Sequence, residues 1–210
     1  MHKGVPAQSF IHAFTLTHSA FSVQLASPEG RPIDFANQDE GSKRWLNEFR
    51  TKPFSTPIKL DTVVASRYSA LLVVDCPGAL YDLALNTQLA QILQHFIIEK
   101  KPICAVGQGV SAFCGVQTLE NINKWALAGY CLTGPSVCEL ARTPGFASLP
   151  IVIEDYVKDN GANYSGSVPD GVHVVVDRNI ITGQNEASTL TAVQNLILLC
   201  NARQGKALTK

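Results

Sequence analysis

The chain has 210 residues, of which 46% are hydrophobic and 16% charged, and its 17 basic and 17 acidic side chains give a formal net charge of zero. We predict one globular domain over residues 1–203 and a disordered polar tail over 204–210. A balanced charge gives no basic field for nucleic acid, and no apolar run approaches the ~18 residues of a membrane span. We therefore expect no direct nucleic-acid binding and no membrane insertion. Without a signal peptide, the expected location is the cytoplasm.

The N-terminal part of the chain predicts one helix followed by little regular structure. Residues 7–20 carry apolar side chains at helical spacing, and residues 21–26 are rich in strand formers. The stretch 31–56 is polar and irregular, with a short helix near 43–50.

A strand, a helix and a second strand follow. Residues 69–74 form a continuous apolar run, as in strands that are buried on both faces of a parallel sheet. Asn86 precedes an amphipathic stripe and is the expected N-cap of a helix that ends before Pro102. The second strand is predicted at 101–106. Together these elements predict a βαβ unit with a right-handed crossover and a parallel sheet.

The junction after the second strand is the place where chemistry is expected, because open α/β sheets place ligands and nucleophiles at the carboxyl ends of their strands. A nucleophile elbow would carry Ser or Cys on the tight turn, where this chain has Gly107. Gly107, Gly109 and Ala112 also fit the short dinucleotide fingerprint, but residues 126–131 lack the acid that this motif requires. The third interpretation is a tight turn that needs glycine and performs no chemistry.

The C-terminal half predicts helices and one hairpin. The expected elements are a helix starting at 111–116, mixed strand residues at 125–133, a short helix within 150–158, strands at 172–177 and 180–182 joined through Arg178 and Asn179, and a helix at 189–202. Six cysteines occur without any CxxC pair, so we expect reduced thiols and no metal site.

Several segments, in this order, resemble the DJ-1/PfpI family of the class I glutamine amidotransferase-like superfamily. They are YSALLV at 68–73, PGA at 77–79, KPICAV at 101–106, LPIVIED at 149–155, HVVVD at 173–177 and ITGQN at 181–185. The resemblance implies an α/β, flavodoxin-like, doubly wound and mostly parallel sheet with helices on both faces. It also implies a homo-oligomer.

The family's first strand has no counterpart in this sequence, and the acidic residue that follows that strand would fall near Lys3. In a flavodoxin-like sheet this strand lies in the interior, so its absence would leave backbone groups of two neighbours unpaired. We therefore expect the sequence to be a shortened form, which an added N-terminal strand would stabilise.

The residues that active family members use for catalysis are also replaced. Such members place a cysteine on the elbow, often followed by histidine, where this chain has Gly107 and Gln108. Many relatives have a glycine pair after the preceding strand, where it supplies oxyanion donors; here the pair is Asp75 and Cys76. The degenerate elbow and pocket comprise Asp75, Cys76, Gly78, Gly107, Gln108 and Gly109. These departures predict a pseudoenzyme without a cofactor.

Our first functional hypothesis is therefore a binding or scaffold subunit. By resemblance, it would belong to a multiprotein Rab effector complex on early endosomes that is linked to messenger RNA transport. The expected partners are further copies of the chain and other protein subunits.

The alternative is a cysteine-dependent hydrolase or a deglycase/glyoxalase-like enzyme that uses Cys76 or Cys104. Asp75, Gln108, His173 or Glu154 would assist. The apolar flanks of Cys104 are typical of an inert core thiol, whereas Cys76 lies on a strand-end loop. Either hypothesis leaves room for a small ligand beside the glycine at the elbow.

Overall fold

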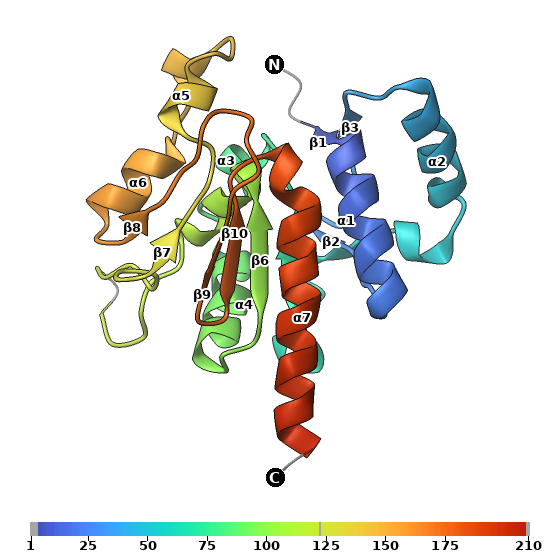
Figure 1. Cartoon of the computed structure of the whole chain (residues 1–210). Helices are drawn as coiled ribbons and strands as arrows, with labels where there is room; N and C mark the ends of the chain where they lie inside the picture. The colour runs from blue at the N-terminus through green and yellow to red at the C-terminus, as the bar shows by residue number, and fades with distance from the viewer. Residues whose placement is uncertain (1–3, 122, 209–210) are drawn as a thin grey trace.

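The computed structural model describes residues 4–121 and 123–208, which form a central sheet with helices on both faces (Figure 1). Its strands are β1 (Val5–Pro6), β2 (Ala26–Ser27), β3 (Phe35–Ala36), β4 (Ile58–Lys59), β5 (Leu71–Val73), β6 (Ile103–Val106), β7 (Cys131–Leu132), β8 (Asn163–Tyr164), β9 (Val174–Asp177) and β10 (Ile180–Gly183). The α-helices are α1 (Ala7–Ala20), α2 (Glu40–Arg50), α3 (Ala79–Asp82), α4 (Thr87–Ile98), α5 (Val137–Leu140), α6 (Ile153–Asp159) and α7 (Thr189–Leu208). Short 3₁₀ helices are η1 (Pro53–Ser55), η2 (Leu60–Thr62), η3 (Ala65–Arg67), η4 (Gly107–Phe113), η5 (Phe146–Ser148) and η6 (Glu186–Ser188).

The central sheet has the strand order β5-β6-β10-β9. Strands β5 and β10 both pair in parallel with β6, and β9 pairs antiparallel with β10. The expected βαβ unit, formed by β5, α4 and β6, is therefore present. The expected hairpin is present too, and its turn residue Arg178 adopts a positive φ of 56°.

The two faces of β6 pack against different helices. Ile103 and Ala105 belong to the cluster that contains the apolar residues of α4. Cys104 and Val106 belong to the cluster that contains Ala192 and other residues of α7. This alternation follows from the period of two along a strand, and it explains why the run is apolar at every position.

The N-terminal segment forms a third cluster beside the sheet. Helix α1 has the predicted bounds and packs Phe10 and Phe14 against Leu46 and Phe49 of α2. The strand expected over 21–26 is reduced to β2, because Phe21 instead closes α1 by donating its backbone N–H to the carbonyl of Thr17. Strands β1 and β3 form one small parallel sheet, and β2 and β4 form another.

Two further expectations about helices are corrected. The helix expected from residue 111 is the 3₁₀ helix η4, and the carbonyl of its last residue, Phe113, accepts a hydrogen bond of 2.8 Å from the indole N–H of Trp125. Residues 204–208, expected in a disordered tail, continue helix α7, while 209–210 lie outside the described residues. Lys3, near which the family's acidic residue would fall, also lies outside the described residues.

Within the described ranges, no helix is long and apolar enough to span a bilayer.

Candidate functional site

The loops after β5 and β6 meet at one edge of the sheet because the two strands are parallel neighbours. Asp75 follows β5, and its Oδ1 accepts a hydrogen bond of 2.9 Å from the backbone N–H of Gln108, just after β6. The structure therefore brings Asp75, Gly107 and Gln108 together at the predicted elbow.

The carboxyl group of Asp75 occupies the space that a side chain on the elbow would need. Gly107 adopts a φ of +54°, and a Cβ built on it would lie closer than 3.0 Å to Cγ, Oδ1 and Oδ2 of Asp75. The expectation that Gly107 leaves room for a ligand is therefore wrong at this point. The space beside Gly107 is filled by a side chain from the loop after β5.

The two other glycines of the predicted pocket, Gly109 and Gly78, lie where the backbone turns into η4 and α3. A Cβ on Gly109 would lie closer than 3.0 Å to the carbonyl oxygen of Val74, so this glycine allows η4 to approach the end of β5. Gly78 precedes α3, and its carbonyl accepts from the backbone N–H of Tyr81 at 2.8 Å. Gly109 therefore serves close backbone packing at the elbow, and Gly78 lies at the start of α3.

The environment of Asp75 favours the protonated carboxyl. Desolvation by the surrounding protein raises its pKa from 3.8 to about 7, and the hydrogen bond from Gln108 opposes this shift. The negative charges of Glu186 and Glu139 raise the pKa further. Near neutral pH this group can therefore donate as well as accept a hydrogen bond. Beside it, the buried Oε1 of Gln108 accepts no hydrogen bond from any described group.

The two candidate cysteines do not meet. Cys104 faces α7, whereas Cys76 packs against the α1–α2 cluster. The partner of Cys104 on β5 is Leu72, four positions before Cys76. Desolvation by burial raises the pKa of both thiols above the ordinary value. An activated cysteine requires the opposite shift, because the thiolate is the nucleophile.

His173 and Glu154, the other assistants considered, have partners elsewhere. Nε2 of His173 lies 3.0 Å from Oγ of Ser165, and Glu154 accepts from the backbone N–H of Val137 at 2.8 Å and pairs with Lys158 at 2.7 Å. Throughout the described ranges, no group of three or more His, Cys, Asp or Glu side chains is arranged to hold a metal ion.

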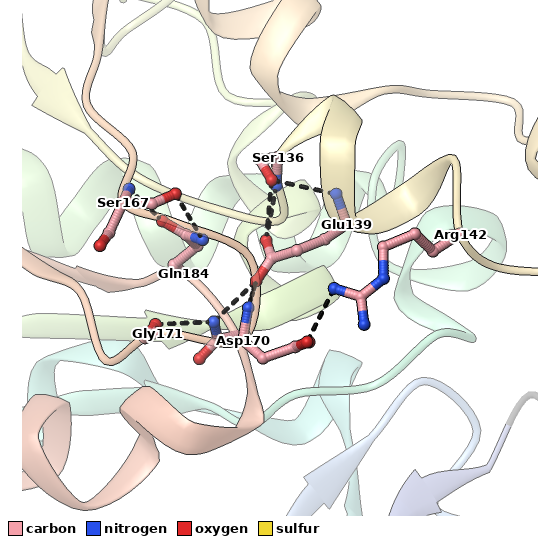
Figure 2. A network of polar contacts seen from close by, with 8 residues as sticks. Ser136, Glu139, Arg142, Ser167, Asp170, Gly171 and Gln184 are labelled. Carbon is pink, nitrogen blue, oxygen red and sulfur yellow. Dashed lines mark hydrogen bonds and ion pairs between the residues drawn. The ribbon is translucent and has the colours of Figure 1, made fainter.

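A polar network at the same edge was missed by the sequence analysis (Figure 2). Glu139 forms a capping box with Ser136 at the start of α5, and its Oε1 accepts from Nδ2 of Asn185 at 2.7 Å and from the backbone N–H of Asp170 at 3.0 Å. Burial alone would raise the pKa of Glu139, but the hydrogen bonds from Asn185, Ser136, Gln184 and Asp170 outweigh it and lower this pKa. The network therefore joins α5 to the loops on either side of the β9–β10 hairpin.

Two signals in the sequence could have located this network. Ser136 and Glu139 have the S-x-x-E spacing of a capping box. Gln184 and Asn185 lie two and three positions after the strand predicted at 180–182, at the edge where ligands bind in such sheets. Buried Gln184 accepts from the backbone N–H of Ser167 at 2.7 Å, so in this structure its side chain fixes a loop.

Comparison with known proteins finds relatives of similar sequence and, at lower identity, solved structures of similar fold. No family model matches the chain. It is 55% identical over 202 residues to glutamine amidotransferase-like class 1 domain-containing protein 1 of Xenopus laevis, covering 96% of this chain and 87% of the relative. The protein of the same name from Homo sapiens is 53% identical over 202 residues, 91% of its length.

Solved structures match the fold at much lower identity. Glyoxalase III from Candida albicans has a TM-score of 0.81 at 18% identity, over 93% of this chain and 87% of that one. Proteins named DJ-1 or ThiJ/PfpI are also among the matches. These likenesses establish the flavodoxin-like DJ-1/PfpI fold.

Proposed function

Since the chain belongs to the family of glutamine amidotransferase-like class 1 domain-containing protein 1, with the DJ-1/PfpI fold, we propose that it is a non-catalytic binding or scaffold domain. One observation carries the proposal. The carboxyl of Asp75 fills the space beside Gly107 where the fold's elbow would carry a nucleophilic side chain. Function depends on the site and not on the fold, and this site lacks the nucleophile.

The thiols support the same conclusion. Burial holds Cys104 inside the core, and the raised pKa values of Cys76 and Cys104 keep both thiols protonated at neutral pH. The alternative enzyme, a cysteine-dependent hydrolase or deglycase/glyoxalase-like protein, would have to activate one of these two groups.

The proposed role is that of a protein subunit. We propose homo-oligomers and a multiprotein complex as its setting, by resemblance a Rab effector complex recruited to early endosomes and linked to messenger RNA transport. The formal net charge of zero supports protein contacts and gives no support to direct RNA binding.

Turnover of methylglyoxal tests the absence of catalysis. The wild type and Cys76→Ser are assayed beside a glyoxalase III enzyme as the positive control. We expect both forms of this chain to match the buffer. Turnover by the wild type that Cys76→Ser abolishes would establish the enzyme instead.

Association in cell extract tests the scaffold role. We expect the tagged wild type and Cys76→Ser to elute alike in a high-molecular-mass complex with the same partner proteins. Elution of both as lone monomers would contradict a subunit role.

A further inference from the structure

A small hollow of about 250 Å³ lies at the edge of the sheet opposite the elbow. Three segments line it: residues 66–69 lead into β5, Lys101 leads into β6, and the third segment belongs to the C-terminal half of α7. Because β5 and β6 are parallel neighbours, their amino ends share this edge, whereas the elbow loops follow their carboxyl ends. The hollow is therefore separate from the elbow.

Cationic side chains dominate the lining of this hollow. Arg67, Lys101 and Arg203 come one from each segment, and Ser66 and Ser69 add hydroxyl groups. Among the described residues, no acidic side chain is part of the lining. The whole chain has as many acidic as basic side chains, so three cations around one hollow are a local excess of positive charge. Such an excess attracts anions.

The half-buried Lys101 is held in place by neutral groups. Its Nζ donates to the backbone carbonyls of Ala65 at 3.3 Å and Ser66 at 3.2 Å. It also lies 3.4 Å from Nε2 of His95 and 5.3 Å from the centre of the Phe96 ring. These contacts position the ammonium group without bringing a carboxylate to it.

Arg203 is positioned in the same way, and Arg67 keeps its donors free. The guanidinium of Arg203 donates to the backbone carbonyls of Lys100 and Glu99, the second at 2.9 Å. Within the part of the chain that the structure describes, none of the three cations forms an ion pair, and the guanidinium of Arg67 has no hydrogen-bond acceptor. The three charges therefore repel one another, and a bound anion would relieve this repulsion.

We propose that this hollow binds the phosphate group of a small phosphorylated molecule. The fork of N–H donors on Arg67 matches two oxygens of a phosphate group. The remaining donors of Arg203 and the hydroxyls of Ser66 and Ser69 serve the other oxygens, and Lys101 contributes its charge. Since Lys101 and Arg203 are already fixed, binding does not have to order them.

The volume favours a phosphate that carries an organic group. A water molecule takes up about 30 Å³ in the liquid, so a hollow of about 250 Å³ is larger than a phosphate group alone requires. The rest of the space suits a small polar substituent, because Gln204 and the two serines also line it.

Titration of the isotope-labelled protein, followed by the amide signals in NMR spectra, tests the proposal. The probes are inorganic phosphate and glycerol 3-phosphate, with glycerol as the uncharged control. We expect both anions to shift the amide signals of residues 66–69 and Lys101, and glycerol 3-phosphate to bind more tightly. Arg67→Gln should weaken binding about tenfold or more, because it removes charge-assisted hydrogen bonds. The exposed Arg44→Gln on α2 is the matched control and should bind as the wild type does.

The absence of shifts at residues 66–69 in the wild type would overturn the proposal, as would equal binding by Arg67→Gln. Equal weakening by Arg44→Gln would also overturn it, because the anion would then respond to surface charge in general. Equal affinity for the two anions would refute the phosphorylated molecule and leave free phosphate as the ligand. Added NaCl tests the wild type alone, since screening of the three charges should weaken binding, and unchanged affinity would contradict the site. The elbow takes no part in these measurements, so their outcome is independent of whether the domain is catalytic.

Discussion

The carboxyl of Asp75 and the absent side chain of Gly107 share one small volume at the end of two neighbouring strands. Either residue restricts what the other position can hold. A cysteine placed at the elbow alone would meet the carboxyl, so a nucleophile there would require changes at both positions. We expect this coupling to be measurable as non-additivity between substitutions.

Substitution of Gly107 by Ala tests the coupling. We expect a loss of about 3 kcal/mol or more in the free energy of unfolding, from the positive φ and the contact with Asp75 together. In the Asp75→Ala background, the same change should cost only about 1–2 kcal/mol, measured by urea unfolding.

Gly129 provides the matched control. It has a φ of +79° and no heavy atom within 4 Å of an added Cβ, so Gly129→Ala should cost about 1–2 kcal/mol in either background. Equal losses for Gly107→Ala and Gly129→Ala would show that the carboxyl does not occupy the elbow.

The raised pKa of Asp75 gives a pH-dependent stability. Its folded pKa of about 7 exceeds the ordinary 3.8, so the folded state holds the extra proton between about pH 4 and 7 and loses stability as pH rises through this window. Asp75→Asn removes the titration. Its stability relative to the wild type should increase by on the order of 2 kcal/mol from pH 5 to pH 8 in urea unfolding. A difference that stays constant over this range would refute the shifted pKa.

At the scale of elements, those with local signals in the sequence could be predicted, and those that depend on tertiary partners could not. Helices α1 and α4 and the β9–β10 hairpin carry their periodicity, caps and turn residues in the sequence, and all three were predicted. The prediction of a strand over 21–26 was wrong. The structure has only the two-residue strand β2 there, and so short a strand depends on its distant partner β4. The hydrogen bond at the end of η4 comes from Trp125, which lies twelve positions after Phe113 and is not a local signal.

The N-cap of α4 offers a direct test at this scale. Oδ1 of Asn86 accepts from the backbone N–H of Leu89 at 3.0 Å, and α4 supplies Leu93 and Phe96 to the core. Asn86→Ala should cost about 1 kcal/mol in thermal or urea unfolding and accelerate amide exchange in the first turn of the helix. The exposed Gln91→Ala is the control and should change little. Equal stability of Asn86→Ala and the wild type would argue against the cap.

At the scale of the whole molecule, the fold class was predictable because the βαβ unit fixes a parallel sheet and the family motifs follow in order. The glycine at the elbow and the glutamine after it were visible in the sequence as Gly107 and Gln108. The position of the Asp75 carboxyl was not, since it depends on the register between β5 and β6. The Glu139 network was missed because it joins residues 139, 170 and 185 through the folded chain.

The most direct test of the central claim, a site without an activated nucleophile, is timed iodoacetamide labelling of the native protein at neutral pH. Peptide mass mapping follows each thiol, with a denatured sample as the control. The exposed Cys138 serves as the internal reference. We predict that Cys76 and Cys104 react much more slowly than Cys138. Labelling of Cys76 or Cys104 faster than Cys138 would reveal an activated thiolate and contradict the account.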